Sequence, residues 1–225
     1  MRIEERIGRI ITLGMFDKIT GVQPCERNIG DYVAAGNPGV VSHKYPQPIE
    51  IPDSFMLGGR VCHKGDYLLR TVFGNSMFVD GIPSGWELLL KPVYGQTINR
   101  GDFVVINVDK DYFKHRHGES TPLFQLKLRR AIGKLMPNDT GASLCNSLRG
   151  TFAEPLDQND QEDLNESLSD ARSFYASNEP LYLSVTYHKS NIHYSFHPVD
   201  SIIYRVEGVA YKSENGLVFK TTEEL

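Results

Sequence analysis

Short apolar stretches separated by glycines are the feature of this 225-residue sequence that most limits its fold. Glycines between the first of these stretches favour tight connections. Strands this short and this regularly interrupted are typical of an all-β body. We therefore predict a mostly β protein, built of curled and twisted sheets. The expected strands lie at 67–73, 88–92, 103–108, 123–132, 181–187, 192–196 and 202–211.

The rest of the sequence predicts three further segments. Residues 1–30 have apolar positions at helical spacing, interrupted by glycines, and we expect a short N-terminal arm that packs on the body or on a neighbour. Prolines and glycines at 31–55 predict an extended, exposed linker. The body itself then occupies 56–225 and contains an acidic insertion at about 138–180.

The acidic insertion differs in composition from the strands around it. Between 154 and 179, eight acidic residues face a single arginine, Arg172. This composition predicts a solvated segment, with one short helix at about 161–174. An acidic surface that binds a partner is the alternative interpretation.

Charge and cysteine content limit the class of protein. The formal net charge of −4 argues against direct binding to nucleic acid. The three cysteines are odd in number and widely spaced, which fits neither a disulfide framework nor a zinc ribbon and favours a reducing cytoplasm. No uncharged run is long enough to span a membrane. The histidines lack nearby carboxylate pairs, so we expect no metal site and no cofactor.

A serine and a lysine are the best candidates for catalytic residues. Ser76 follows Gly74-Asn75, a sequence that can form a sharp turn and expose a hydroxyl group. A serine hydroxyl needs a base to become a nucleophile, and a lysine can be that base where burial keeps its amine uncharged. Lys127 lies in the apolar stretch 123–128 and fits this requirement. The backbone N–H groups of Asn75 and Ser76 are candidates for stabilising the oxyanion.

Three stretches in this order resemble the self-cleaving serine peptidases of the LexA/UmuD family. They are Val33-Ala34-Ala35-Gly36-Asn37-Pro38, Gly74-Asn75-Ser76-Met77 and Phe124-Gln125-Leu126-Lys127. The resemblance implies a Ser76–Lys127 dyad that cleaves the chain's own bond between Ala35 and Gly36. It also implies a role in the DNA-damage (SOS) response, a homodimer, stimulation by a recombinase filament and, in UmuD-like members, a translesion polymerase as partner.

Two departures from the family leave alternatives open. The separation of Ser76 and Lys127 is longer than in typical members, with the surplus in the charged loop 110–122. A second alignment places Leu128-Arg129-Arg130 on the family's hydrophobic-Lys-Arg pattern, and Arg129 would then stand at the position of the base. Because arginine does not deprotonate in proteins, that alignment predicts an inactive peptidase. A catalytically silent repressor-like or partner-binding module is therefore one alternative, and a relative of the signal peptidases is another.

Overall fold

Residues 32–35, 46–94, 97–118, 125–140, 158–175, 180–188 and 191–225 are described by the computed structural model. Most of their regular structure is β, as the sequence predicts. Helices α3 (Lys110–His117) and α5 (Gln158–Tyr175) and 3₁₀ turns at Lys64–Asp66, Val199–Ser201 and Thr222–Glu224 accompany the strands. The strands are β1 (Tyr32–Ala34), β2 (Ser54–Leu57), β3 (Arg60–His63), β4 (Leu68–Phe73), β5 (Glu87–Pro92), β6 (Phe103–Asn107), β7 (Leu126–Leu135), β8 (Leu181–His188), β9 (Asn191–Pro198), β10 (Ile202–Ser213) and β11 (Gly216–Thr221).

One large sheet forms the body, and part of it closes on itself. Its strands follow the order β1-β4-β5-β10-β6-β7-β8-β9, with β11 added to β10. β1 also pairs with β7, so the path from β1 through β4, β5, β10 and β6 to β7 returns to its start. β1 is parallel to both of its neighbours, whereas the other pairs in the sheet are antiparallel. The short strand next to the predicted cleavage site is therefore the one that closes this ring.

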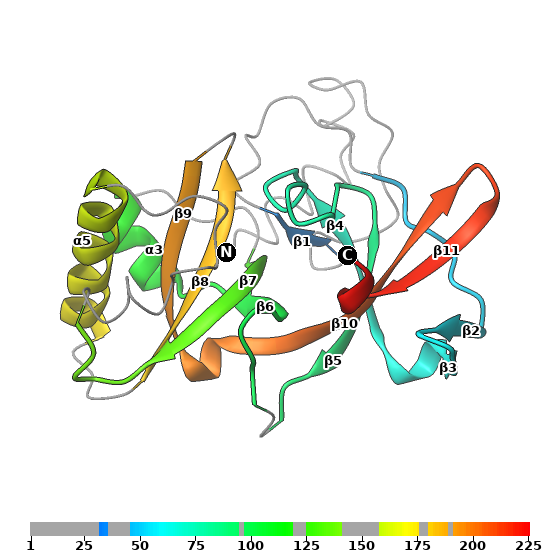
Figure 1. Ribbon diagram of the computed structural model, residues 1–225, viewed down its shortest axis with the longest axis horizontal. Coiled ribbons are helices and arrows are strands. Elements are labelled where there is room, and N and C mark those ends of the chain that lie inside the picture. Colours follow the sequence, from blue (N-terminus) through cyan, green and yellow to red (C-terminus); the bar gives the residue numbers. More distant parts are fainter. Residues whose placement is uncertain are drawn as a thin grey trace, which may run out of the picture.

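The apolar strands are buried on both faces. In β5, Leu88 and Leu90 point into the cluster that also holds Val72, Met77 and Leu128, while Leu89 points into a second cluster with Phe55. Because successive side chains in a strand point to opposite faces, a continuous apolar run such as Leu88-Leu89-Leu90 fits this two-sided position. The long strand β10 runs across the middle of the molecule and joins these layers (Figure 1).

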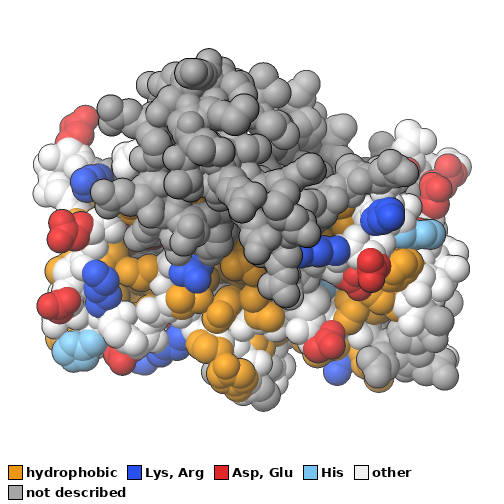
Figure 2. All heavy atoms as spheres, turned by 180° about the vertical axis from the view of Figure 1, so that it is seen from behind, with side chains coloured by type: hydrophobic (Ala, Val, Ile, Leu, Met, Phe, Trp, Pro, Cys, Tyr) orange, Lys and Arg blue, Asp and Glu red, His pale blue; other side chains and the backbone are white. Residues whose placement is uncertain are grey.

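The two ends of the sheet are covered differently. The hairpin β2–β3 lies beside β11 at one end, and helices α3 and α5 lie beside β8 and β9 at the other (Figure 1). Helix α5 buries Leu164, Leu168 and Ala171 in a cluster with residues of β8 and β9, including Leu183 and Phe196. On the reverse face, hydrophobic side chains gather along the middle of the described surface, with charged side chains towards both ends (Figure 2).

The structure changes two sequence-based expectations and leaves others aside. The linker 31–55 is not exposed throughout its described residues, because Tyr32–Ala34 form a strand of the sheet and Ile49 and Ile51 are buried. Residues 110–117, expected to belong to a charged loop, form helix α3, because the Asp109 carboxylate caps its first turn by accepting hydrogen bonds from the N–H groups of Asp111 and Tyr112. The predicted arm at 1–30 lies outside the described residues, and so do residues 141–157 and 176–179 of the acidic insertion. Within the described ranges, no helix is both long and apolar enough to span a membrane.

Candidate active site

The backbone of Ala35 lies against the turn that carries Ser76. Strand β1 brings it there by pairing Ala34 with Phe73 of β4 and with Lys127 of β7. The Ala35 N–H donates a hydrogen bond to the Phe73 carbonyl oxygen over 2.7 Å, and the Ser76 N–H donates one to the Ala35 carbonyl oxygen over 3.4 Å. The carbonyl of the predicted scissile bond therefore faces a backbone donor of the serine turn.

Gly74 makes this close approach possible. It has φ +100°, a conformation that side chains disfavour, and a Cβ atom at this position would stand 2.5 Å from the Ala35 carbonyl oxygen. Any other residue here would push Ala35 away from the turn. The sequence Gly74-Asn75-Ser76 thus combines a glycine that admits the peptide with a serine directly beside it.

The serine turn is held to neighbouring strands on two sides. The Ser84 hydroxyl donates to the Val72 carbonyl oxygen and accepts from the Gly74 N–H, and the Asn75 amide oxygen accepts from the Ser84 N–H. Downstream of the serine, Asp80 forms an ion pair with Arg130 of β7, with 2.9 Å between Oδ1 and Nη1. These contacts fix the turn relative to the strand that carries Lys127.

The Ser76 hydroxyl is not hydrogen-bonded to Lys127. Its Oγ atom is buried and has no hydrogen-bond partner among the described residues. A buried hydroxyl without a partner is uncommon in folded proteins and is found at catalytic positions. Ser76 therefore has the environment expected of a nucleophile.

Lys127 lies on β7 directly beside β1. It is paired with Ala34 on one side and with Ile106 of β6 on the other, and its side chain is only 5 % exposed. Burial, and after it the charge of Arg129, lower the pKa of Lys127 from 10.5 to about 7. The Phe113 ring of α3 lies over the amine, with Nζ 4.8 Å from the ring centroid. An amine with this pKa is partly uncharged at neutral pH, as a general base requires.

Arg129 lies two residues further along the same strand. Its partner in the register is Val104, whereas the residue of β7 that pairs with β1 in the described register is Lys127. Of the two alignments that the sequence allows, this register favours the one in which Lys127 takes the position of the base. Burial lowers the pKa of Arg129 to about 10, so its guanidinium keeps its charge at neutral pH.

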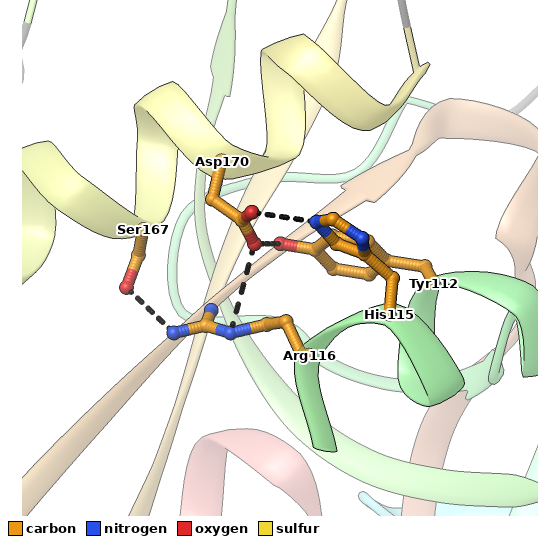
Figure 3. A network of polar contacts seen from close by, with 5 residues as sticks. All are labelled: Tyr112, His115, Arg116, Ser167 and Asp170. Atoms are coloured by element: carbon orange, nitrogen blue, oxygen red, sulfur yellow. Dashed lines mark hydrogen bonds and ion pairs between the residues drawn. The ribbon is translucent and has the colours of Figure 1, made fainter. Parts of the chain in front are cut away.

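Helix α3, which supplies Phe113, is docked on helix α5 by a polar network (Figure 3). Asp170 of α5 is its centre. Its carboxylate accepts a hydrogen bond from the Tyr112 hydroxyl over 3.3 Å, lies 2.9 Å from His115 Nε2 and lies 3.9 Å from Arg116 Nε. Arg116 also donates to the Ser167 hydroxyl over 3.1 Å. Helix α3, whose Phe113 ring covers the Lys127 amine, is thus held by Ser167 and Asp170. Both residues belong to the region that the sequence predicted to be a solvated insertion.

Part of the chain matches a known protein family. Residues 28–121 match the family model described as Peptidase S24-like. This part of the chain is S24-like. The match is consistent with the LexA/UmuD resemblance. It contains Ala35 and Ser76 and ends before Lys127, which the sheet register pairs with Ala34. Neither the comparison with curated proteins nor the comparison with solved structures gave a match.

The remaining predicted site residues are placed in different ways. The Ser76 N–H faces the Ala35 carbonyl, but no hydrogen bond from the Asn75 N–H to that oxygen is found in the described contacts. Gly36 lies outside the described residues. Within the described part of the chain, no group of three or more potential ligands that could hold a metal ion occurs.

Sequence reasoning missed Phe113 and the role of Gly74 as the point of closest approach. Phe113 was inside a stretch interpreted as a loop, although Asp109 followed by Tyr112 and Phe113 is the kind of capped, partly apolar start that marks a helix. The contact between Gly74 and Ala35 joins residues far apart in the sequence and has no local signal.

Proposed function

We propose that this S24-like chain is a serine peptidase that cleaves its own bond between Ala35 and Gly36. Ser76 is the nucleophile and Lys127 the general base. The observation that carries the proposal is the hydrogen bond from the Ser76 N–H to the Ala35 carbonyl oxygen, made while Ala34 is paired with Lys127. The serine turn and the strand that carries the buried amine then both lie beside the end of β1.

The proposed reaction requires Lys127 to come within hydrogen-bonding distance of the Ser76 hydroxyl, to which it is not hydrogen-bonded in this structure. Uncharged Lys127 takes the proton of the Ser76 hydroxyl, and Oγ attacks the Ala35 carbonyl carbon. The Ser76 N–H donates to the oxyanion that forms. The Lys127 ammonium returns the proton to the nitrogen of Gly36, which leaves as an amine, and water then hydrolyses the ester between Ala35 and Ser76. Because the substrate strand belongs to the same molecule, capture of the substrate adds no loss of translational entropy.

Self-cleavage should depend on pH through Lys127. The pKa of Lys127 is about 7, so at a pH below 7 the amine is protonated in most molecules. The rate should then fall about tenfold for each further pH unit. Above pH 8 the rate should level off. Mass spectrometry after incubation between pH 6 and pH 9 measures this directly, with expected products 1–35 and 36–225.

Matched variants separate the proposed dyad from general effects. Ser76→Ala and Lys127→Ala should remain whole. Ser213→Ala, and Lys134→Ala at an exposed position of the same strand as Lys127, should cleave like the parent. Normal cleavage of Ser76→Ala or Lys127→Ala would refute the assignment. A parent that never cleaves would favour the catalytically silent, partner-binding alternative.

The biological setting that we propose comes from the resemblance to the LexA/UmuD family. It is a UmuD-like role in the DNA-damage response, with a homodimer, a recombinase filament as the stimulus and a translesion polymerase as a possible client. Large hydrophobic side chains exposed just after the serine turn, Phe78 and Val79, fit a protein-binding surface near the site. Light scattering on the purified protein tests the dimer, and a monomer at all concentrations would contradict it.

A further inference from the structure

A second buried cation shares a face of the sheet with Lys127. Arg129 follows Lys127 by two residues on β7, so both side chains point to the same face, with Cα atoms about 7 Å apart. Arg129 is only 6 % exposed. Its register partner, Val104, belongs to an apolar cluster with Ile106 and Ala131.

The Arg129 guanidinium has little compensation for its burial. One nitrogen, Nη1, donates to the Leu128 carbonyl oxygen over 2.8 Å, and Nε is buried without a hydrogen-bond partner in the described residues. In the described part of the chain, no carboxylate forms an ion pair with Arg129. A buried positive charge without an ion-pair partner is costly and is seldom kept for stability alone.

The other ionisable group facing this pair is uncharged. On the same face, His197 of β9 lies 3.1 Å from the Ser184 hydroxyl through Nε2. Burial, followed by the charges of Arg129 and Lys127, lowers the pKa of His197 to about 3. Ala34 of β1, Ile106 of β6 and the Phe113 ring of α3 also lie next to Lys127, and none of them titrates. Arg129 is a cation whose charge lowers the pKa of Lys127.

We propose that Arg129 is a positioning residue for the Ser76–Lys127 dyad: its buried charge repels a proton on Lys127 and so sets the pH range in which the lysine is a base. Arginine suits this task because it stays protonated where a second buried lysine would give up its own proton. Arg129 could not act as the base itself, because arginine does not deprotonate. Two residues away from Lys127, it helps the lysine to do so. The predicted effect of Arg129 on the cleavage rate rests on the proposed function. Its predicted effect on the protonation of Lys127 does not, and can be measured in a protein that does not cleave.

The test measures Lys127 directly, in a protein that does not cleave. In the Ser76→Ala protein with ¹³C-labelled lysine, the Lys127 Nζ-bound methylene signal is followed by NMR from pH 5 to pH 11, with and without Arg129→Gln. A unit charge at this distance in a protein interior is expected to shift the midpoint by about one pH unit, upwards when the charge is removed. In the parent Ser76 protein, the same substitution should slow self-cleavage about tenfold at pH 6 and little at pH 9.

Arg70→Gln is the matched control. Arg70 of β4 also donates from Nη1 to the carbonyl oxygen of the preceding residue, over 2.8 Å, but it lies opposite Leu88 of β5 rather than beside Lys127. This variant should leave the Lys127 midpoint within about 0.2 pH units of the parent, the precision expected of such a titration.

The outcomes separate this inference from the proposed function. An unchanged Lys127 midpoint in Arg129→Gln, or in Arg129→Met should the glutamine variant not fold, overturns the inference whether or not the parent cleaves itself. A raised midpoint in a protein that never cleaves supports the inference and refutes the proposed function. A rate that falls equally at all pH values, with the midpoint unchanged, would assign Arg129 a purely structural role.

Discussion

Gly74 meets two structural requirements of the candidate site, a positive φ and a close approach to Ala35. A Cβ atom at this position would stand 2.5 Å from the Ala35 carbonyl oxygen, whose carbon is the proposed point of attack. The fold therefore needs glycine here for two reasons, its positive φ and the close approach of Ala35. These two reasons can be separated experimentally because the chain has other glycines with positive φ.

Gly74→Ala should abolish self-cleavage and leave the fold intact. The added methyl group displaces Ala35, and a displacement of about 1 Å at a reacting centre can reduce the rate about a hundredfold. The strain of positive φ should lower the free energy of unfolding by about 1–2 kcal/mol. Fragment yield by mass spectrometry and thermal unfolding by circular dichroism measure the two effects.

Gly101→Ala is the control for strain. Gly101 has φ +94°, and a Cβ atom there would meet nothing within 4 Å. This variant should lose similar stability and keep its cleavage. If Gly74→Ala cleaves as fast as Gly101→Ala, the Ala35 carbonyl is not attacked from the position seen here.

Among the elements, the apolar strands were the part of the structure that the sequence predicted best. A run such as Leu88-Leu89-Leu90 is buried on both faces, and it can be recognised from the local sequence alone. The helix in the acidic region was also predicted, but its length was underestimated, since α5 extends over Gln158–Tyr175. Leu164 and Leu168 of α5, two of its few large apolar residues, pack on the sheet and give the helix a buried face that net charge conceals.

What the sequence could not predict are the pairings between distant elements. The parallel position of β1 between β4 and β7 depends on contacts of a three-residue strand, for which propensity carries little information. The charged residues of α3 favoured a loop because their partners on α5, Ser167 and Asp170, are more than fifty positions away. Ser76, Lys127 and Arg129 were all named as candidates from the sequence, whereas the contact of Phe113 with Lys127 depends on the position of α3.

Asp170→Ala should loosen helix α3. The substitution removes an acceptor for the Tyr112 hydroxyl and an ion-pair partner for His115 and Arg116. Because the Asp170 side chain is about one-third exposed, solvent screening limits the expected loss to about 1 kcal/mol, or about 2–4 °C in Tm. Amide hydrogen exchange should accelerate in 110–117 and not in β4 or β5.

Asp163→Ala, on the exposed side of the same helix, provides the comparison. It changes the net charge and the helix composition in the same way as Asp170→Ala, but it removes none of the contacts with α3 described above. Equal Tm values for the two variants, or unchanged exchange in α3 of Asp170→Ala, would show that the network in Figure 3 does not hold α3 in place.

For the whole molecule, the position of β1 has a consequence for the cleaved form. Tyr32, Val33 and Ala34 are almost completely buried, and the Tyr32 ring packs edge-on against Phe73 with 6.4 Å between centroids. Release of this strand would expose apolar surface and leave open edges on both β4 and β7. Cutting the bond after Ala35 removes the covalent tether on one side of β1 but none of these contacts.

We therefore expect fragment 1–35 to remain bound to fragment 36–225 after cleavage. Burial of the tyrosine and valine side chains alone contributes about 3–6 kcal/mol, which corresponds to retention at micromolar or higher protein concentration once the backbone pairing is added. The cleaved protein should elute as one species in size-exclusion chromatography, and native mass spectrometry should give the summed mass. Denaturant should separate the fragments. Separate elution without denaturant, with β4 and β7 still protected from hydrogen exchange, would mean that the ring can do without β1; the strand would then serve as substrate alone, and the cut would free the arm at once.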